Sequence, residues 1–136
     1  ELLPKELVDQ LNDVAIKTKG IKGVLINVAI GYGGRSEIAD AVKSIITSPE
    51  NSGKSAAEIA NSINVDEIGR HLYTAGLPDP DLVIRTSGEQ RLGGFLLWQS
   101  AHSEFYFCEA YWPDFRRVDF LRAIRAYSQR NRRFGK

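Results

Sequence analysis

Two arginines separated by a loop of small residues are the strongest chemical feature of this sequence. Arg85 ends the apolar run 82–85, residues 86–88 are Thr, Ser and Gly, and Arg91 follows. Guanidinium groups offer paired donors that match phosphate oxygens, and the small residues leave room for an anion to approach the backbone. Because ligands of open α/β sheets collect beyond the carboxyl ends of parallel strands, the run predicts a buried strand that ends at a phosphate site.

An acidic residue, Glu104, stands directly before the aromatic run 105–107. Taken alone, it is best interpreted as a solvated charge at the entry of a strand. Together with two arginines directed at phosphate, it predicts a divalent cation, because Mg²⁺ is commonly held by one or two carboxylates plus phosphate oxygens. Glu104 is therefore the candidate metal ligand.

A second candidate anion site is the glycine turn 31–34, since backbone amides at the start of a helix attract anions. Ser36 stands where a dinucleotide fingerprint needs its third glycine. A tight turn between a strand and a helix is favoured over a phosphate cradle by about two to one.

The end of the chain is strongly basic, although the net charge of the whole chain is only +1. A solvated helix face, a nucleic-acid patch and part of a phosphate site all remain open as interpretations. The cationic residues are Arg116, Arg117, Arg122, Arg125, Arg130, Arg132, Arg133 and Lys136.

Composition excludes several classes of protein. The 136 residues are 43% hydrophobic, which suits one compact domain or part of a larger one. Cys108 is the only cysteine, which excludes an internal disulfide, and it is interpreted as a small buried hydrophobe. No apolar run is long enough for a membrane helix and no signal-peptide pattern is present, so a cytoplasmic protein is expected. The chain has no methionine, and we expect it to be part of a longer protein.

Apolar periodicity, caps and turn residues predict alternating helices and strands. We therefore expect an α/β fold with a mainly parallel central sheet flanked by helices and joined by right-handed crossovers. The expected elements are a helix at 4–19, a central strand at 24–30, a helix through 38–46, two short helices capped by Ser55 with Glu58 and Asn64 with Glu67, a strand at 82–85, a short buried helix at 95–101, an aromatic strand at 105–108 and a last helix opening at Asp114 or Val118.

Several of these segments, in this order and spacing, resemble the cis-prenyltransferases, the undecaprenyl diphosphate synthase family of Z-type isoprenyl diphosphate synthases. The resemblance covers essentially the whole chain and corresponds to the C-terminal half of the family's single domain. The matching segments are 81–91 (DLVIRTSGEQR), 95–99 (FLLWQ), 104–107 (EFYF), 112–115 (WPDF), 32–35 (YGGR) and 132–135 (RRFG).

The resemblance implies condensation of isopentenyl diphosphate with an allylic diphosphate to form a cis double bond, with Mg²⁺ as cofactor. It implies that Arg85 and Arg91 bind the diphosphate of isopentenyl diphosphate, and that Glu104 helps to hold the metal. Leu92 and Gly93 join the substrate-binding set. The last two members of that set, Arg133 and Gly135, belong to a tail motif that reaches the site of the partner subunit in a homodimer.

Two positions depart from the family pattern: Gly93 stands where a serine usually donates to phosphate, and Gly31 stands where asparagine is frequent. No segment matches the family's Asp-Gly-Asn-Gly-Arg-Trp block, whose aspartate binds metal and the allylic diphosphate. No catalytic residue is therefore expected within this chain, and the chain alone is expected to be inactive.

The resemblance further implies a cytoplasmic homodimer that meets the inner face of the membrane through its lipid product and binds no nucleic acid. Two alternatives stay open from the sequence. One is a non-catalytic partner or scaffold subunit of the same fold. The other is an anion or nucleic-acid binding module that uses the basic C-terminal tail, which predicts salt-sensitive binding.

Overall fold

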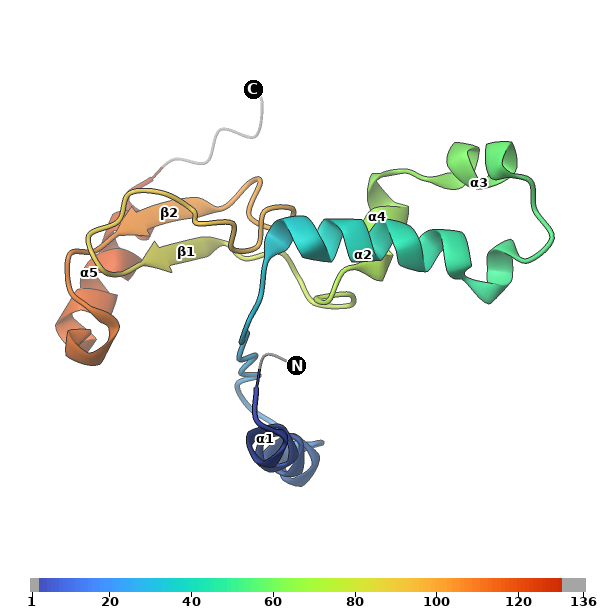
Figure 1. Ribbon diagram of the computed structural model, residues 1–136. Coiled ribbons are helices and arrows are strands. Elements are labelled where there is room, and N and C mark those ends of the chain that lie inside the picture. Colours follow the sequence, from blue (N-terminus) through green and yellow to red (C-terminus); the bar gives the residue numbers. More distant parts are fainter. Residues whose placement is uncertain (1–2, 131–136) are drawn as a thin grey trace. The chain divides into compact units, whose positions relative to one another are not determined.

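A computed structural model describes residues 3–130. The chain divides into two units, Glu1–Tyr32 and Gly33–Lys136. The first unit holds helix α1 (Lys5–Thr18), which begins after Pro4 and ends before Lys19 (Figure 1). The predicted helix at 4–19 is confirmed.

The second half of the first unit contains an apolar segment, 24–30, that the sequence predicts as a central strand. The predicted strand is not formed in this chain: the segment has no strand assignment, and β1 and β2 are the strands of the described residues. Its apolar side chains are largely exposed, Val24 at 91% and Ile26 at 77%. A strand needs a neighbour for its backbone hydrogen bonds, and β-branched side chains alone do not provide one.

Helices make up the first part of the second unit. They are α2 (Gly34–Thr47), α3 (Ala56–Ser62) and α4 (Val65–His71), with a short 3₁₀ helix η1 (Pro49–Asn51) after α2. The predicted caps of the two short helices are confirmed. Ser55 and Glu58 form a reciprocal capping box at α3, and the side chain of Asn64 accepts from the Glu67 N–H at α4.

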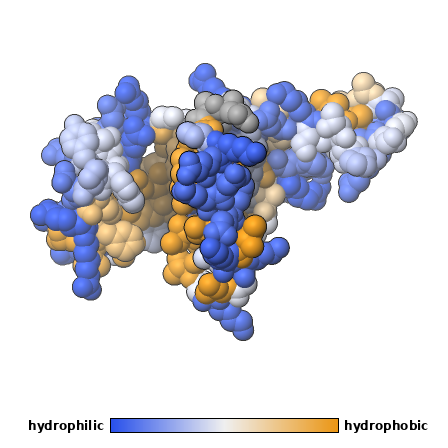
Figure 2. Space-filling view, turned by 60° about the horizontal axis from the view of Figure 1, so that its bottom comes forward, coloured by the Kyte–Doolittle hydropathy of each residue, from blue (hydrophilic) through white to orange (hydrophobic). Residues whose placement is uncertain are grey.

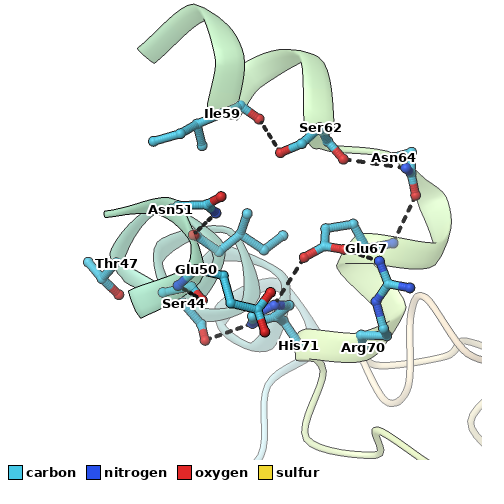
Figure 3. Close-up of polar contacts among 12 residues, drawn as sticks. Ser44, Thr47, Glu50, Asn51, Ile59, Ser62, Asn64, Glu67, Arg70 and His71 are labelled. Carbon is cyan, nitrogen blue, oxygen red and sulfur yellow. Dashed lines mark hydrogen bonds and ion pairs between the residues drawn. The ribbon is translucent and has the colours of Figure 1, made fainter. Parts of the chain in front are cut away.

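Helices α2 and α4 pack against each other and also share polar contacts (Figure 3). The Ser44 hydroxyl of α2 lies 2.8 Å from Nδ1 of His71, and Nε2 of His71 lies 3.3 Å from a carboxylate oxygen of Glu67. A hydrogen bond from Arg70 lowers the pKa of Glu67. These contacts fix the histidine within the packing of two helices.

The sheet of the second unit is formed by β1 (Leu82–Arg85) and β2 (Glu104–Phe107), which run parallel. Leu82 is paired with Glu104 and Arg85 with Phe107. After the 3₁₀ helix η2 (Trp112–Asp114), helix α5 (Arg117–Ser128) packs on β2 (Figure 1). Both predicted strands and the α/β class are confirmed.

The segment between the strands is not the short helix that the sequence predicts at 95–101. It is a succession of turns. Leu96 has a φ of 45°, in the left-handed region that interrupts a right-handed helix. The apolar pattern of the segment was correctly identified, but apolar side chains alone do not distinguish a helix from packed turns.

Few apolar residues of the described part of the chain are buried: Ala41, Ile45, Leu72 and Ala123. Larger ones, such as Phe120 and Leu121 of α5, remain about half exposed, and Figure 2 shows apolar side chains in orange on the surface. None of the described helices combines the length and the apolar character that a bilayer span requires.

Candidate phosphate site at the end of strand β1

Arg85 is the last residue of β1, where the sequence places the end of the strand. Its carbonyl accepts from the Cys108 N–H at 2.8 Å, which extends the ladder between the two strands by one bond. Its side-chain Nε is buried and has no hydrogen-bond partner among the described residues. A buried donor of this kind is costly unless an acceptor satisfies it, so the site is suited to an anion.

Arg85 is one of the residues that line a cavity of about 320 Å³. Its lining combines apolar side chains with two hydroxyl residues and Arg85. The lining residues are Val83, Ile84, Arg85, Thr86, Ser87, Leu92, Phe95 and Phe105. The cavity therefore suits a molecule with an anionic head and a short apolar tail.

Two amides of the loop after β1 are used inside the fold and are not offered to a ligand. The Ser87 N–H donates to the Ala110 carbonyl at 2.9 Å, and the Gly88 N–H donates to the Cys108 carbonyl at 3.0 Å. The expected approach of an anion to this stretch of backbone is therefore wrong for these two amides. Ser87 has a φ of 76°, unusual for a residue with a side chain, and these bonds hold it there. An anion would meet side chains instead.

The two residues that follow the second arginine lie beside Arg85. Leu92 lines the cavity. Gly93 has a φ of 63°, and a Cβ atom built on it would lie 3.1 Å from Nη1 of Arg85. A glycine at this position lets the guanidinium group lie against the backbone. A serine, the residue expected from the resemblance, would crowd that group with its Cβ atom.

Arg91 does not line this cavity. Its side chain is 75% exposed and its Nε lies 3.0 Å from a carboxylate oxygen of Glu89. The two arginines that the sequence groups together therefore differ in this structure. Arg85 is held within the fold, whereas Arg91 forms a surface ion pair.

Glu104 opens β2, so it lies at the opposite end of the strand pair from Arg85. The strand rise puts their backbone positions about 10 Å apart along the strands. Its Oε2 accepts from Nη1 of Arg130 at 2.5 Å. A carboxylate suits Mg²⁺ chemically, but the described residues contain no group of three acidic, His or Cys side chains that could hold a metal.

The remaining candidates from the sequence, Arg133 and Gly135, lie outside the described residues. The glycine turn leads into the predicted helix, α2, but the strand expected before it is not formed. Gly33 is the N-cap, and the Gly34 N–H donates to the Gly94 carbonyl at 2.9 Å. That amide is used inside the fold and is not presented to a ligand.

Sequence reasoning missed several residues around this site. Phe95 and Phe105 line the cavity, but aromatic residues in apolar runs carry no signal that separates a wall from a core. It also missed Glu37, which is completely buried on the first turn of α2 and accepts hydrogen bonds from Gln99. An acid in the first turn of a helix is ordinary, so the sequence alone did not identify it.

Comparison with known proteins identifies the family. Residues 1–135 match the family described as "Putative undecaprenyl diphosphate synthase". Isoprenyl transferase 1 of Streptomyces avermitilis is 57% identical over 135 residues, which is 99% of this chain and 52% of that protein. The (2Z,6E)-farnesyl diphosphate synthase of Thermobifida fusca is 58% identical over 135 residues, 99% of this chain and 53% of that protein.

A solved structure is similar in fold as well. Lavandulyl diphosphate synthase from Lavandula x intermedia, in complex with dimethylallyl diphosphate, matches with a TM-score of 0.87 and 36% identity. The match covers 98% of this chain and 56% of that chain. The chain thus spans about half the length of the relatives it matches. Through residues 1–135, it belongs to the undecaprenyl diphosphate synthase family of prenyltransferases.

Proposed function

We propose that this chain is the isopentenyl-diphosphate-binding part of a cis-prenyltransferase, which condenses isopentenyl diphosphate with an allylic diphosphate to give a Z-isoprenyl diphosphate. The observation that carries the proposal is the buried Nε of Arg85 beside a cavity with apolar walls. A charged diphosphate and a five-carbon apolar group are the two parts that such a cavity recognises. The names of the similar isoprenyl transferase and farnesyl diphosphate synthase support the same chemistry.

In this reaction the Arg85 guanidinium binds the diphosphate and holds its charge away from the reacting carbon atoms. The hydroxyls of Thr86 and Ser87 are available as further donors, and Phe95 with Phe105 excludes water from the apolar group. Preorganised donors in a site sheltered from water stabilise charge more strongly than water does. Arg91 becomes the second phosphate ligand by exchanging the carboxylate of Glu89 for phosphate oxygens.

The rest of the site is proposed to come from beyond these residues. Glu104 is the one carboxylate assigned to Mg²⁺, which when bound would neutralise diphosphate charge. Arg133 and Gly135 are assigned to the substrate site of the partner in a homodimer. The aspartate that binds the allylic diphosphate is assigned to the other half of the relatives' length, so this chain alone is inactive.

A contact with the inner face of the membrane is part of the same proposal. It follows from the product, because a polyprenyl chain partitions into lipid while its diphosphate stays in water. No part of the described chain is assigned to that contact.

Two measurements test the proposal. The first is calorimetric titration of isopentenyl diphosphate into the chain. Arg85→Ala should weaken binding about ten- to hundredfold, because a hydrogen-bonded charge is lost from the site. Arg122→Ala, which changes net charge equally but removes a residue paired with Asp119 on α5, should bind like the wild type. Equal affinity of the wild type and Arg85→Ala for isopentenyl diphosphate would show that the diphosphate does not bind at this loop.

The second measurement is incorporation of radiolabelled isopentenyl diphosphate into longer products, with an allylic diphosphate and Mg²⁺ present. We expect no incorporation by this chain alone. Incorporation should appear when the chain is preceded by the complementary half of the Streptomyces avermitilis relative. A chimera that folds and binds isopentenyl diphosphate without turnover would favour the non-catalytic partner subunit.

A further inference from the structure

Glu37 is a buried carboxylate that the proposed site does not use. It lies on the first turn of α2 with 0% of its surface exposed. Its Oε1 accepts from the Tyr73 N–H at 2.9 Å and from Gln99 Nε2 at 3.0 Å, and its Oε2 lies 3.1 Å from the same Nε2. A buried carboxylate is retained only with such partners, so Glu37 joins α2 to two segments that are distant in sequence.

Gln99 is the central partner and is 3% exposed. Its Nε2 also donates to Oγ1 of Thr74 at 2.8 Å. The amide cannot be reversed, because its oxygen would then face the carboxylate of Glu37. In the orientation observed, Oε1 of Gln99 has no partner among the described residues. The contact with Glu37 therefore determines the orientation of the Gln99 side chain, although it leaves the amide oxygen without a hydrogen bond among the described residues.

A second contact attaches the same turn segment to α2. The Gly34 N–H donates to the Gly94 carbonyl, and a Cβ atom on Gly34 would lie 2.5 Å from that carbonyl oxygen and 3.0 Å from Cγ of Leu97. Segment 93–99 is thus fixed to the first turn of α2 near both of its ends, by Gly34 at one and Glu37 at the other.

The fixed segment carries residues of the candidate site. The Cβ position of Gly93 is 3.1 Å from Nη1 of Arg85, and Phe95 is a wall of the cavity. We propose that Glu37 is a positioning residue for diphosphate binding, which acts through Gln99 to hold segment 93–95 against Arg85. This inference rests on the proposed function and adds to it a residue that touches neither substrate nor metal.

Reversal of the Glu37–Gln99 pair tests the inference. Glu37→Gln, Gln99→Glu and the double variant E37Q/Q99E are compared with the wild type by calorimetric titration of inorganic pyrophosphate, below the unfolding temperature of every protein. Gln99→Glu brings two carboxylates together and breaks the contact. The double variant restores the contact in reverse, since the amide introduced on α2 can donate to the carboxylate introduced on the turn segment and still accept from the Tyr73 N–H.

We expect Gln99→Glu to bind pyrophosphate about tenfold more weakly, and the double variant to return to within about threefold of the wild type. Emission from Trp98, next to Gln99, should shift in Gln99→Glu and return in the double variant, with Trp112→Phe present throughout because the chain has two tryptophans. Asp40→Asn is the control. It weakens the contact of α2 with the Tyr73 hydroxyl but not with segment 93–99, and should leave affinity unchanged.

Each outcome separates this inference from the proposed function. Wild-type affinity in Gln99→Glu, or a double variant no tighter than Gln99→Glu, overturns the positioning role. If Gln99→Glu does not fold, Glu37→Gln is compared with the double variant, and wild-type affinity in Glu37→Gln overturns it. Loss of binding in Gln99→Glu together with unchanged binding in Arg85→Ala would instead refute the diphosphate site at Arg85, and the positioning role with it.

Discussion

At the scale of single residues, Gly93 controls how closely the backbone approaches Arg85. A Cβ atom there would lie 3.1 Å from Nη1 of Arg85, closer than most real contacts. Gly93→Ala should therefore displace the guanidinium group and weaken pyrophosphate binding by about threefold or more, with the positive φ adding about 1 kcal/mol of backbone strain. Calorimetric titration and urea unfolding measure the two effects separately.

Gly94→Ala is the matched control for this prediction. Gly94 also has a positive φ, 84°, but a Cβ atom there meets nothing within 4 Å. Gly94→Ala should lose about as much stability as Gly93→Ala but keep the wild-type affinity for pyrophosphate. Gly93→Ser tests the family's usual residue, because recovery of affinity relative to Gly93→Ala would show that a hydroxyl donor offsets the crowding. Equal affinity in the alanine variants of Gly93 and Gly94 would contradict the steric argument.

Glu89 competes with phosphate for Arg91. The pair is exposed, and ion pairs of this kind are weak and screened by salt. Glu89→Gln should free Arg91 and tighten pyrophosphate binding about two- to fivefold at low ionic strength, with the gain fading at high salt. In the background of Arg91→Ala, the same change should have a smaller effect. An equal gain without Arg91 would mean that Glu89 acts by general repulsion.

Residue types and order predicted only part of this site. The position of Arg85 at the end of a strand could be predicted, because a short apolar run indicates both the buried strand and the residue at which it ends. The ion pairs of Arg91 with Glu89 and of Glu104 with Arg130 could not be predicted, because several charges near in sequence or space compete for each partner. The role of Glu37 depends on a contact across 62 positions of sequence.

At the scale of elements, the start of α2 is packed too closely for any side chain at Gly34. Gly34→Ala places a Cβ atom 2.5 Å from the Gly94 carbonyl oxygen, and backbone cannot move as freely as a side chain. Overpacking of this kind costs about 1–3 kcal/mol. Gly33→Ala is the neighbouring control, because its Cβ atom would make only an ordinary contact, 3.7 Å from Oγ of Ser36. Urea unfolding should show a clear loss for the first variant, and equal stability of the two would refute the close packing.

The contact of α2 with the turn after α4 depends on pH through Asp40. A hydrogen bond from the Tyr73 hydroxyl, followed by the hydrogen bond and the charge of Lys43, lowers the pKa of Asp40. A carboxyl group whose pKa is lowered by folding stabilises the fold above its unfolded pKa of about 3.9, and this stabilisation is lost as the pH falls through the folded value. Tyr73→Phe should therefore destabilise the protein at pH 7, and by progressively less below about pH 4.

The titration of Asp40 itself checks this prediction. Carbon-detected NMR should show the pKa of Asp40 rising toward its ordinary value in Tyr73→Phe and also in Lys43→Ala, because both side chains lower it. If the pKa of Asp40 is the same in Tyr73→Phe and the wild type, the hydroxyl does not act on this carboxylate in solution.

Elements with local signals were predictable, and those that depend on distant neighbours were not. The caps at Ser55 and Asn64 were predicted because their partners lie within three residues. Segment 24–30 has the composition of a strand but lacks a strand assignment, since pairing is not local. Segment 95–101 was mistaken for a helix because its apolar pattern does not show the positive φ of Leu96, and its contact with Glu37 spans 62 positions of sequence.

At the scale of the molecule, many large apolar side chains of the described residues are exposed to solvent. Few apolar side chains of the described residues are fully buried, whereas several large ones are more than half exposed, among them Val24, Leu25, Ile26 and Val28. Burial of each such side chain contributes about 1.5–3 kcal/mol, so a covered segment is strongly favoured over an exposed one. Because this chain spans about half the length of its relatives, we expect the other half to cover segment 24–30 and to pair with it as a strand.

Hydrogen exchange tests this expectation on the chain alone and on the chimera that adds the complementary half of the Streptomyces avermitilis relative. In the chain alone, amides of 24–30 should exchange within seconds, whereas those of the paired strand β1 should be slower. In the chimera, the amides of 24–30 should become at least as protected as those of β1. Because Val24→Asp places a charge in this segment, it should reduce protection in the chimera and leave the chain alone unchanged. Rapid exchange of 24–30 in a folded chimera would mean that this segment is not a strand in the longer protein.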